Sequence, residues 1–194
     1  MADQKISAMP SAATLTGAEL VPLVQSGANV KVTLDTLRAY DSNYGAFSSN
    51  VDQVGNVSAG VAMTFSSTDL SGGVTLASGS RLTVPLTGVY NIQFSAQLKN
   101  TTNAQEDATI WFRINGTDVP GSSTQITVPA RKSAGVFGYA VASWNIFLSM
   151  TASQYVEIIW LPTSVDVTVE ALPGSVTPAY PAIPSVIATV NQVG

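Results

Sequence analysis

The chain has 194 residues and a formal net charge of −4, and it is 45% hydrophobic but only 10% charged. Typical soluble domains carry roughly 25% charged residues, so most of this surface must consist of uncharged polar groups or be covered by partners. Because phosphate binding needs clustered Lys and Arg, this balance of charge argues against a nucleic-acid partner.

Cysteine and histidine are absent, which excludes disulfides, the usual zinc ligand sets and catalytic triads that depend on histidine. A glycosidase would need paired carboxylates on facing strands. Glu106-Asp107 lies in a turn-like segment, and Glu157 stands alone in an apolar stretch. We therefore expect no enzymatic activity, no metal site and no cofactor.

The N-terminal stretch MADQKISAMPSAATL has no basic start followed by an apolar core of about 7–15 residues, as a secretory signal has. No apolar run approaches the roughly 20 residues that a membrane-spanning helix needs. We expect a protein that is assembled in the cytoplasm and has no membrane partner.

Residues 1–40 have a pattern of their own and are predicted to form an arm. Within them, the apolar stretches LVPLV and VKVTL flank the turn-forming QSGAN, which predicts a β-hairpin. Pro22 has no N–H group to donate and therefore indicates an edge strand. Asp35 is placed to cap a single helical turn.

Residues 41–60 contain turn-forming residues every few positions without a sustained period, so we interpret them as a linker.

Residues 61–194 alternate short strands with turns, and the whole chain contains 23 Val and 20 Thr, which favour strands. Asn115-Gly116 suits the positive φ angles of a type I′ hairpin turn. Many short strands with almost no helix predict an all-β sandwich or barrel. The expected strands are 61–66, 74–76, 81–84, 89–99, 108–115, 118–127, 134–149, 154–161, 165–172 and 184–192.

The stretch GVYNIQFSAQL, residues 88–98, alternates apolar and polar residues most clearly. A period of two is typical of a strand with one buried face. We expect Tyr90, Ile92, Phe94 and Leu98 to fill the sandwich. The amides and hydroxyl between them meet either water or another subunit.

Two later stretches are apolar on both faces, which an outer strand of a sandwich in water does not need. They are YVEIIWL, interrupted only by Glu157, and WNIFLSM. Apolar outer faces mark contacts between subunits, although every protein exposes a few apolar side chains. The predicted subunit interface consists of Tyr155, Glu157, Ile159, Leu161 and Phe147.

The segment LTVPLTGVYNIQFSAQL resembles the strand-turn-strand signature of the tumour-necrosis-factor and complement-C1q-like jelly rolls. Pro85, Gly88, Val89 and Tyr90 occupy the positions of its Pro and its Gly-Val-Tyr. ATIWFRINGTDV and FLSMTASQYVEIIWL resemble later strands of the family, although SQYVEI departs from its usual Gly-Asp before the Val. The resemblance covers about residues 55–192. It implies a jelly-roll β-sandwich of about ten strands that assembles as a trimer.

The arm sequence KISAMPSAATLTGAELVPLVQSGANVKVTLDTL is similar to the leading segment of many tailed-phage virion proteins, including head fibres, tail fibres and decoration proteins. The ending PAIPSVIATVNQVG also resembles the terminal strand of phage surface jelly rolls. These resemblances imply that the arm attaches the protein to a virion. The capsid-binding residues would be Lys5, Ile6, Met9, Pro10, Leu15, Leu20, Val21, Pro22, Leu23 and Val24.

Together the resemblances imply a structural capsid decoration, or cement, protein. As a homotrimer it would bind the major capsid protein on the outer surface of the virion and stabilise the shell. The alternative is a tail fibre or receptor-binding protein that recognises a host surface glycan by stacking sugars on Trp111, Trp144 or Trp160. Each Trp lies among apolar neighbours, which favours core packing. The absence of a long shaft sequence favours decoration.

Overall fold

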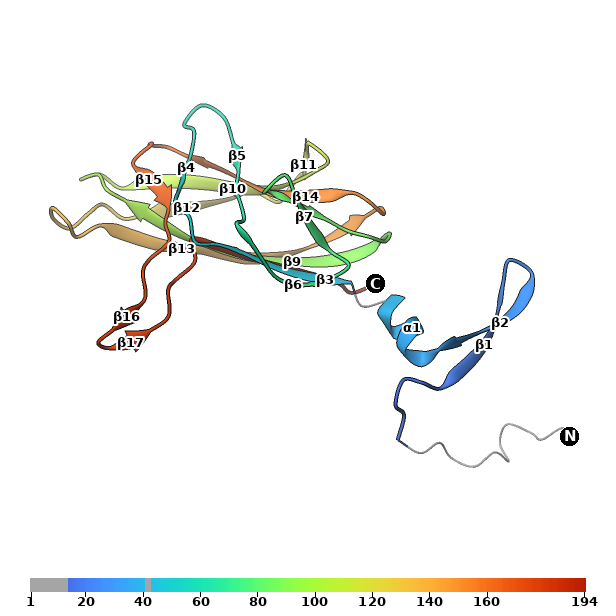
Figure 1. Ribbon diagram of the computed structural model, residues 1–194. Coiled ribbons are helices and arrows are strands. Elements are labelled where there is room, and N and C mark those ends of the chain that lie inside the picture. Colours follow the sequence, from blue (N-terminus) through green and yellow to red (C-terminus); the bar gives the residue numbers. More distant parts are fainter. Residues whose placement is uncertain (1–13, 41–42) are drawn as a thin grey trace, which may run out of the picture. The chain divides into compact units, whose positions relative to one another are not determined.

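The computed structural model describes residues 14–40 and 43–194. The chain divides into two compact units, Met1–Asp41 and Ser42–Gly194 (Figure 1). The smaller unit contains a two-stranded sheet and one short helix, and the larger unit contains two seven-stranded sheets and a separate small hairpin.

The smaller unit is built on a hairpin. β1 (Leu20–Gln25) and β2 (Ala28–Thr33) pair antiparallel along their whole length, and α1 (Leu34–Tyr40) follows directly. Ser26 and Gly27 close the hairpin with φ angles of 51° and 79°. A type I′ turn requires positive φ at both central residues, which explains this turn sequence.

The helix α1 begins earlier than the sequence predicts. The Thr33 hydroxyl accepts a hydrogen bond from the Thr36 amide at 3.2 Å. Thr33 rather than Asp35 therefore caps the helix. Asp35 lies in the first turn, where a negative charge is stabilised by the positive end of the helix dipole.

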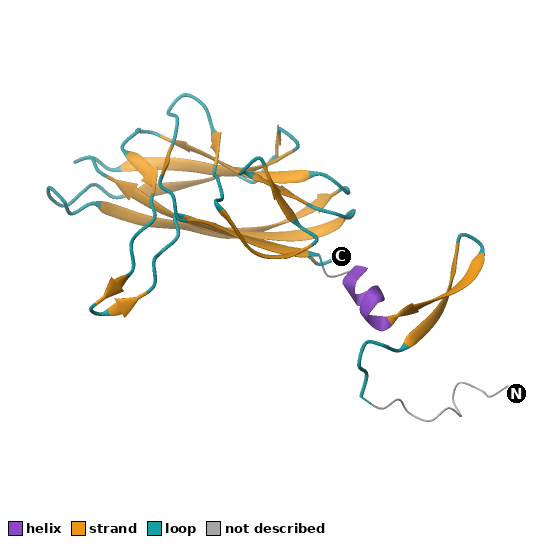
Figure 2. Ribbon diagram, in the orientation of Figure 1, coloured by secondary structure: helices purple, strands orange, loops and turns teal. Residues whose placement is uncertain are grey.

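The larger unit consists of two antiparallel sheets that form two layers (Figures 1 and 2). One layer, the β14 sheet, has the order β11-β10-β14-β8-β7, with β12 also on β10 and β5 also on β14. Its strands are β5 (Val61–Ala62), β7 (Thr75–Ala77), β8 (Arg81–Thr83), β10 (Glu106–Ile114), β11 (Thr117–Asp118), β12 (Thr124–Val128) and β14 (Tyr155–Pro162).

The other layer, the β9 sheet, has the order β4-β15-β9-β18-β3-β6, with β13 on the opposite edge of β9. Its strands are β3 (Tyr44–Ser49), β4 (Gln53–Val54), β6 (Ser67–Gly72), β9 (Gly88–Asn100), β13 (Gly138–Met150), β15 (Val167–Val169) and β18 (Val186–Gln192). A separate hairpin of β16 (Ser175–Val176) and β17 (Ala179–Tyr180) extends away from the layers (Figure 2).

The strand β9 carries the alternation that its sequence predicts. Tyr90, Ile92, Phe94, Ala96 and Leu98 are at most 5% exposed, and the polar side chains between them lie on the outer face. This confirms the predicted inward face. The prediction of a nearly all-β protein with antiparallel sheets is also confirmed.

An aromatic cluster joins the two sheets. Phe94 and Trp144 from the β9 sheet pack edge-on with a centroid distance of 4.5 Å, and Phe112 from the β14 sheet lies 5.8 Å from Phe94 and 6.3 Å from Trp144. Such pairs contribute about 0.5–1.5 kcal/mol each beyond the apolar area that they bury. The cluster therefore stabilises the contact between the layers.

The interpretation of residues 41–60 as a linker is wrong for the described part of that range. β3 is an internal strand between β18 and β6, and Phe47 is fully buried against Phe65. The inward positions of β3 are Gly45, Phe47 and Ser49, so only one of them is a large apolar residue. Gly45 is required there, because a Cβ would lie 2.6 Å from the Phe47 ring. The hydrophobic pattern therefore could not reveal the strand.

Other boundaries differ where turns interrupt the expected strands. The predicted strand 118–127 is divided into β11 and β12, and the loop between them contains Gly121 with φ of 74°. Residues 67–72, which lie outside the expected strands, form β6. The predicted strand 165–172 is shortened to β15, and Val165 lies outside it with 57% exposure.

Candidate functional site

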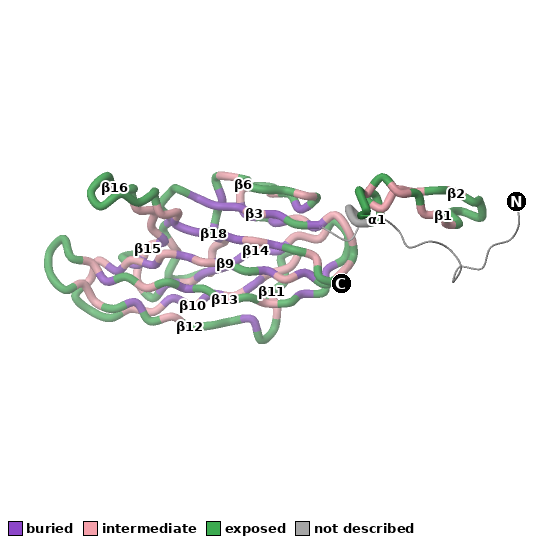
Figure 3. The backbone as a smooth tube through the Cα atoms, turned by 90° about the horizontal axis from the view of Figure 1, so that it is seen from below, coloured by how far each residue is buried: buried purple, intermediate pink, exposed green. Residues whose placement is uncertain are grey.

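The strands β13, β9, β18 and β3 lie side by side in the β9 sheet (Figure 3). Their register aligns three rows of side chains on the outer face of this sheet. None of these side chains is charged. This surface, the uncharged face, consists of Phe147, Asn91, Asn191 and Tyr44; Asn145, Gln93, Thr189 and Ala46; and Ser143, Ser95, Ile187 and Ser48. Burying it costs less than burying ions, because its polar groups can exchange water for neutral hydrogen bonds.

Apolar side chains stand exposed on the uncharged face. Phe147 is 59% exposed, Ile187 41% and Tyr44 40%, and Val141 continues the apolar row along β13 with 56%. Single exposed apolar residues are common, but several on one uncharged face mark an interaction surface. The predicted interface residue Phe147 lies here.

Charged side chains lie only at the margins of the uncharged face, and one pair of them is compensated within the chain. Asp69 accepts a hydrogen bond from the Ser48 hydroxyl at 3.0 Å. The Lys99 ammonium pairs with the Glu170 carboxylate at 2.5 Å. A partner at the Lys99–Glu170 margin would therefore not have to supply opposite charges, whereas Asp69 is an exposed anion that only a neutral hydroxyl contacts.

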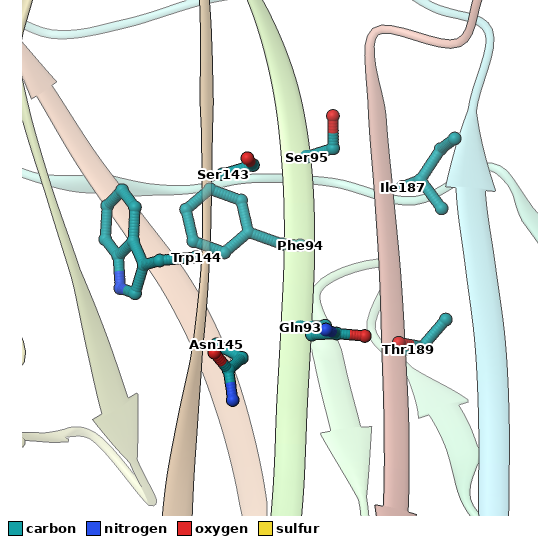
Figure 4. Close-up of a pocket in the computed structure, with 8 residues that line it drawn as sticks. All are labelled: Gln93, Phe94, Ser95, Ser143, Trp144, Asn145, Ile187 and Thr189. Atoms are coloured by element: carbon teal, nitrogen blue, oxygen red, sulfur yellow. The ribbon is translucent and has the colours of Figure 1, made fainter.

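A shallow hollow of about 290 Å³ lies in the middle of the uncharged face (Figure 4). Gln93 and Asn145 contribute amides, and Ile187 and Thr189 line the side formed by β18. The Asn145 amide donates to the Asn91 carbonyl oxygen at 3.2 Å, which ties β13 to β9 through side chains. The hollow can accept a small protruding side chain of a partner.

The predicted interface on β14 is largely covered by the chain itself. Ile159 is only 1% exposed, because the backbone at Gly60 passes over it. A Cβ on Gly60 would lie 2.7 Å from the Ile159 side chain. Ile159 is therefore not available to another subunit, and its prediction is wrong. The residue that would have indicated this burial is Gly60, but its contact with Ile159 can be recognised only from the packing of the folded chain.

The other β14 residues have partners within the chain. The Glu157 carboxylate accepts a hydrogen bond from the Ser80 hydroxyl at 2.7 Å and lies 3.7 Å from Arg81. The Arg81 guanidinium also lies 4.5 Å above the Tyr155 ring. Tyr155, Glu157 and Leu161 are half-buried, so their place in an interface stays a prediction.

The arm unit has no core of its own. Among residues 14–37, whose exposure the structure describes, none is buried. Of the predicted capsid-binding residues, Leu15, Leu20, Pro22 and Val24 are exposed and Val21 and Leu23 are half-buried. Lys5, Ile6, Met9 and Pro10 lie outside the described residues. Since apolar side chains point to both sides of the hairpin, this unit presents an unsatisfied apolar surface.

Backbone hydrogen bonds hold the leading segment of the arm against the start of α1. The Leu34 amide donates to the Glu19 carbonyl and the Asp35 amide to the Gly17 carbonyl, both at 3.0 Å. The Glu19 carboxylate accepts hydrogen bonds from the Thr16 amide, the Thr16 hydroxyl and the Gly17 amide. These bonds, above all that from the Thr16 amide, lower the pKa of Glu19 to about 2.

Replacing Gly17 by alanine will loosen this junction. Gly17 has φ of 93°, and a Cβ there would overlap the Asp35 carboxylate. The left-handed conformation alone costs about 1–2 kcal/mol for a residue with a side chain. We expect hydrogen exchange at the Leu34 and Asp35 amides, measured by NMR, to accelerate about 5- to 30-fold.

Gly27→Ala is the matched control for this substitution. Gly27 also has positive φ, but a Cβ there would meet no atom within 4 Å. Gly27→Ala therefore introduces similar backbone strain in the hairpin turn without a steric clash with a neighbouring side chain. Equal acceleration at the Leu34 and Asp35 amides in both variants would contradict the specific contact.

The candidate carboxylates for chemistry are engaged by neighbouring side chains. Glu106 accepts a hydrogen bond from the Thr163 hydroxyl, and Asp107 accepts from Gln125 and Thr127. Across residues 14–40 and 43–194, no group of three or more acidic, His or Cys side chains is placed to hold a metal ion. Within the same part of the chain, no helix is long and apolar enough to cross a membrane.

No family model matches this chain, and no curated protein matches it.

Proposed function

We propose that this chain is a tailed-phage capsid decoration protein, which binds the outer surface of the capsid as a homotrimer and stabilises the shell. One observation carries this proposal. The chain joins an apolar arm without a core to a β-sandwich with a large uncharged face. Both features leave surface that a partner can cover. The apolar arm suits attachment to another protein, and the uncharged face suits association with further copies of this chain.

The sandwich is proposed to be a jelly roll. The neighbours β13-β9-β18-β3 in one layer and β12-β10-β14-β8 in the other support this topology. Along the chain, β8, β9 and β10 alternate between the layers, as do β12, β13 and β14. Eight main strands divided between two antiparallel sheets in this way are typical of a jelly roll.

The trimer is proposed to form through the uncharged face rather than through β14. Most oligomers of identical chains have closed symmetry, so the same surface of each copy approaches the axis. Phe147 and Tyr44 supply exposed aromatic rings, which are enriched at interface centres. Amides and hydroxyls around them can hydrogen-bond across the boundary.

The arm is proposed to bind the major capsid protein. Ordering an extended segment costs about 1–2 kcal/mol per residue in backbone entropy, which apolar burial must offset. Leu15, Leu20 and Val24 are 56–68% exposed and can supply that burial. A trimer presents three arms, and such multivalency strengthens attachment by about 10²–10⁴-fold over one arm.

Copy number in purified virions tests this function. A decoration protein covers a lattice, so gel densitometry against the major capsid protein should give tens to hundreds of copies per particle. Electron microscopy should place them at three-fold positions of the shell. A few copies located at the tail would instead support the receptor-binding fibre and contradict decoration.

A further inference from the structure

The three Trp side chains occupy different environments, and only one of them lies on an outer face. Trp160 is fully buried, and Trp144 packs edge-on in the aromatic cluster between the sheets. Trp111 alternates with the buried Ile110 and Phe112 along β10, so it lies on the outer side of the β14 sheet. Of the three, Trp111 is the one placed to meet a ligand.

A surface hollow of about 380 Å³ lies beside Trp111. It is bounded by the loop 119–123, which connects β11 to β12, and by Thr109 and Asp118. Ligand pockets typically measure about 300–1,000 Å³, so this hollow has room for a single small ring rather than an extended chain.

Two contacts within the chain hold the indole of Trp111 along one edge. Its Nε1 donates to Asp118 Oδ1 at 2.7 Å. Next to Nε1, the Cζ2–Cη2 edge of the six-membered ring packs against the backbone at Gly60, where a Cβ would overlap it. An aromatic face fixed in this way binds a ligand without a further loss of side-chain entropy.

Several polar groups at the hollow remain free. Asp118 Oδ1 accepts from Trp111 and, at 2.7 Å, from Arg113 Nε. Asp118 Oδ2 and the hydroxyls of Thr109 and Ser123 make no hydrogen bond to any described residue. The hydrogen bonds from Arg113 and then Trp111 lower the pKa of Asp118, so its carboxylate stays an acceptor in mildly acidic solution.

We propose that this hollow binds one neutral saccharide unit. The C–H face of the sugar ring lies on the indole of Trp111, and a pair of sugar hydroxyls donates to Asp118 Oδ2. The hydroxyls of Thr109 and Ser123 complete the contacts. An apolar surface with a few convergent polar groups is the usual composition of a small-ligand site, and bonds to a carboxylate are among the stronger hydrogen bonds.

The local charge favours a neutral sugar over an ionic one. Arg113 and Asp118 form an ion pair at 2.7 Å, so together they contribute no net charge to the hollow. An anionic sugar would face the free oxygen of Asp118. The site lies on the β14 sheet, opposite the uncharged face of the β9 sheet, and therefore stays open in the proposed trimer. Saccharide binding goes beyond capsid decoration and does not depend on it.

Saturation-transfer NMR with the full-length protein tests the proposal. The probes are the methyl glycosides of glucose, galactose, mannose and N-acetylglucosamine, with the methyl glycoside of sialic acid as the anionic comparison. We expect at least one neutral glycoside to bind with Kd of about 0.1–10 mM. Trp111→Ala should weaken that binding at least about tenfold, and so should Thr109→Val combined with Ser123→Ala.

The double variant Thr109→Val with Ser123→Ala keeps Trp111 and its packing. If Trp111→Ala does not fold, this double variant alone tests whether the hollow binds the sugar. Tyr180→Ala is the matched control, because Tyr180 is an aromatic residue 49% exposed on the separate β16–β17 hairpin. It should leave the affinity unchanged. Failure of every neutral glycoside to bind, binding of the sialoside alone, or equal loss in Tyr180→Ala would overturn the proposal.

Discussion

We expect deletion of residues 1–40 to leave a folded trimer that no longer binds the capsid shell, as the proposed attachment through the arm requires. The two sheets of the sandwich contain no strand from the arm, since β1 and β2 form a sheet of their own. Folding of the larger unit should therefore not depend on residues 1–40. Loss of three arms should weaken attachment by at least about 10²–10⁴-fold. Co-sedimentation with shells that lack the protein measures binding, and circular dichroism checks the fold.

A paired substitution locates the attachment within the arm. Leu20→Asp with Val24→Asp changes two exposed side chains of β1, so the hairpin itself should still form. It should reproduce most of the loss in binding. Lys31→Ala, at an exposed position of the facing strand β2, is the matched control and should bind like the unmodified protein. Full binding after the deletion would move the attachment site to the sandwich.

Phe147→Asp is expected to dissociate the proposed trimer. Phe147 is 59% exposed in the single chain and lies on the uncharged face, where no cation is available to pair with a carboxylate. A charge buried in an interface without a partner is strongly unfavourable. Truncating an aromatic residue at an interface centre costs about 2 kcal/mol or more, which corresponds to about 30-fold in the dissociation constant. Analytical ultracentrifugation at micromolar concentration measures the change.

Val165→Asp is the matched control for the uncharged face. Val165 is 57% exposed, close to the value for Phe147, but it lies in the loop before β15. The variant should sediment as the unmodified protein does. Dissociation by Val165→Asp but not by Phe147→Asp would place the interface elsewhere. A monomeric unmodified protein at micromolar concentration would contradict the proposed trimer and weaken the case for capsid decoration.

The local sequence was sufficient to predict features that depend on a single turn or a single strand. Asn115 and Gly116 adopt φ angles of 47° and 83° between β10 and β11, which confirms the predicted hairpin. The period of two in β9 correctly separated its buried and outer residues, because neighbouring side chains of a strand point to opposite faces. These features depend on backbone sterics over a few residues.

Long-range packing decided which surfaces remain available. The apolar residue Ile159 looked suited to another subunit, but the crossing backbone at Gly60 covers it. Tyr44 belongs to the uncharged face although it lies in the range interpreted as a linker. Trp111 is distinguished from Trp160 only by the side of the sheet that each occupies.

The sequence by itself determined the all-β class, the main strands and the scarcity of charge, because composition and alternation express the cost of burying polar groups. The tertiary structure alone decided which outer face stays uncovered and that the sandwich begins with β3 rather than near residue 61. Those outcomes depend on contacts between segments up to a hundred or more residues apart, such as β3 with β18. A pattern read along the chain contains no direct record of such contacts.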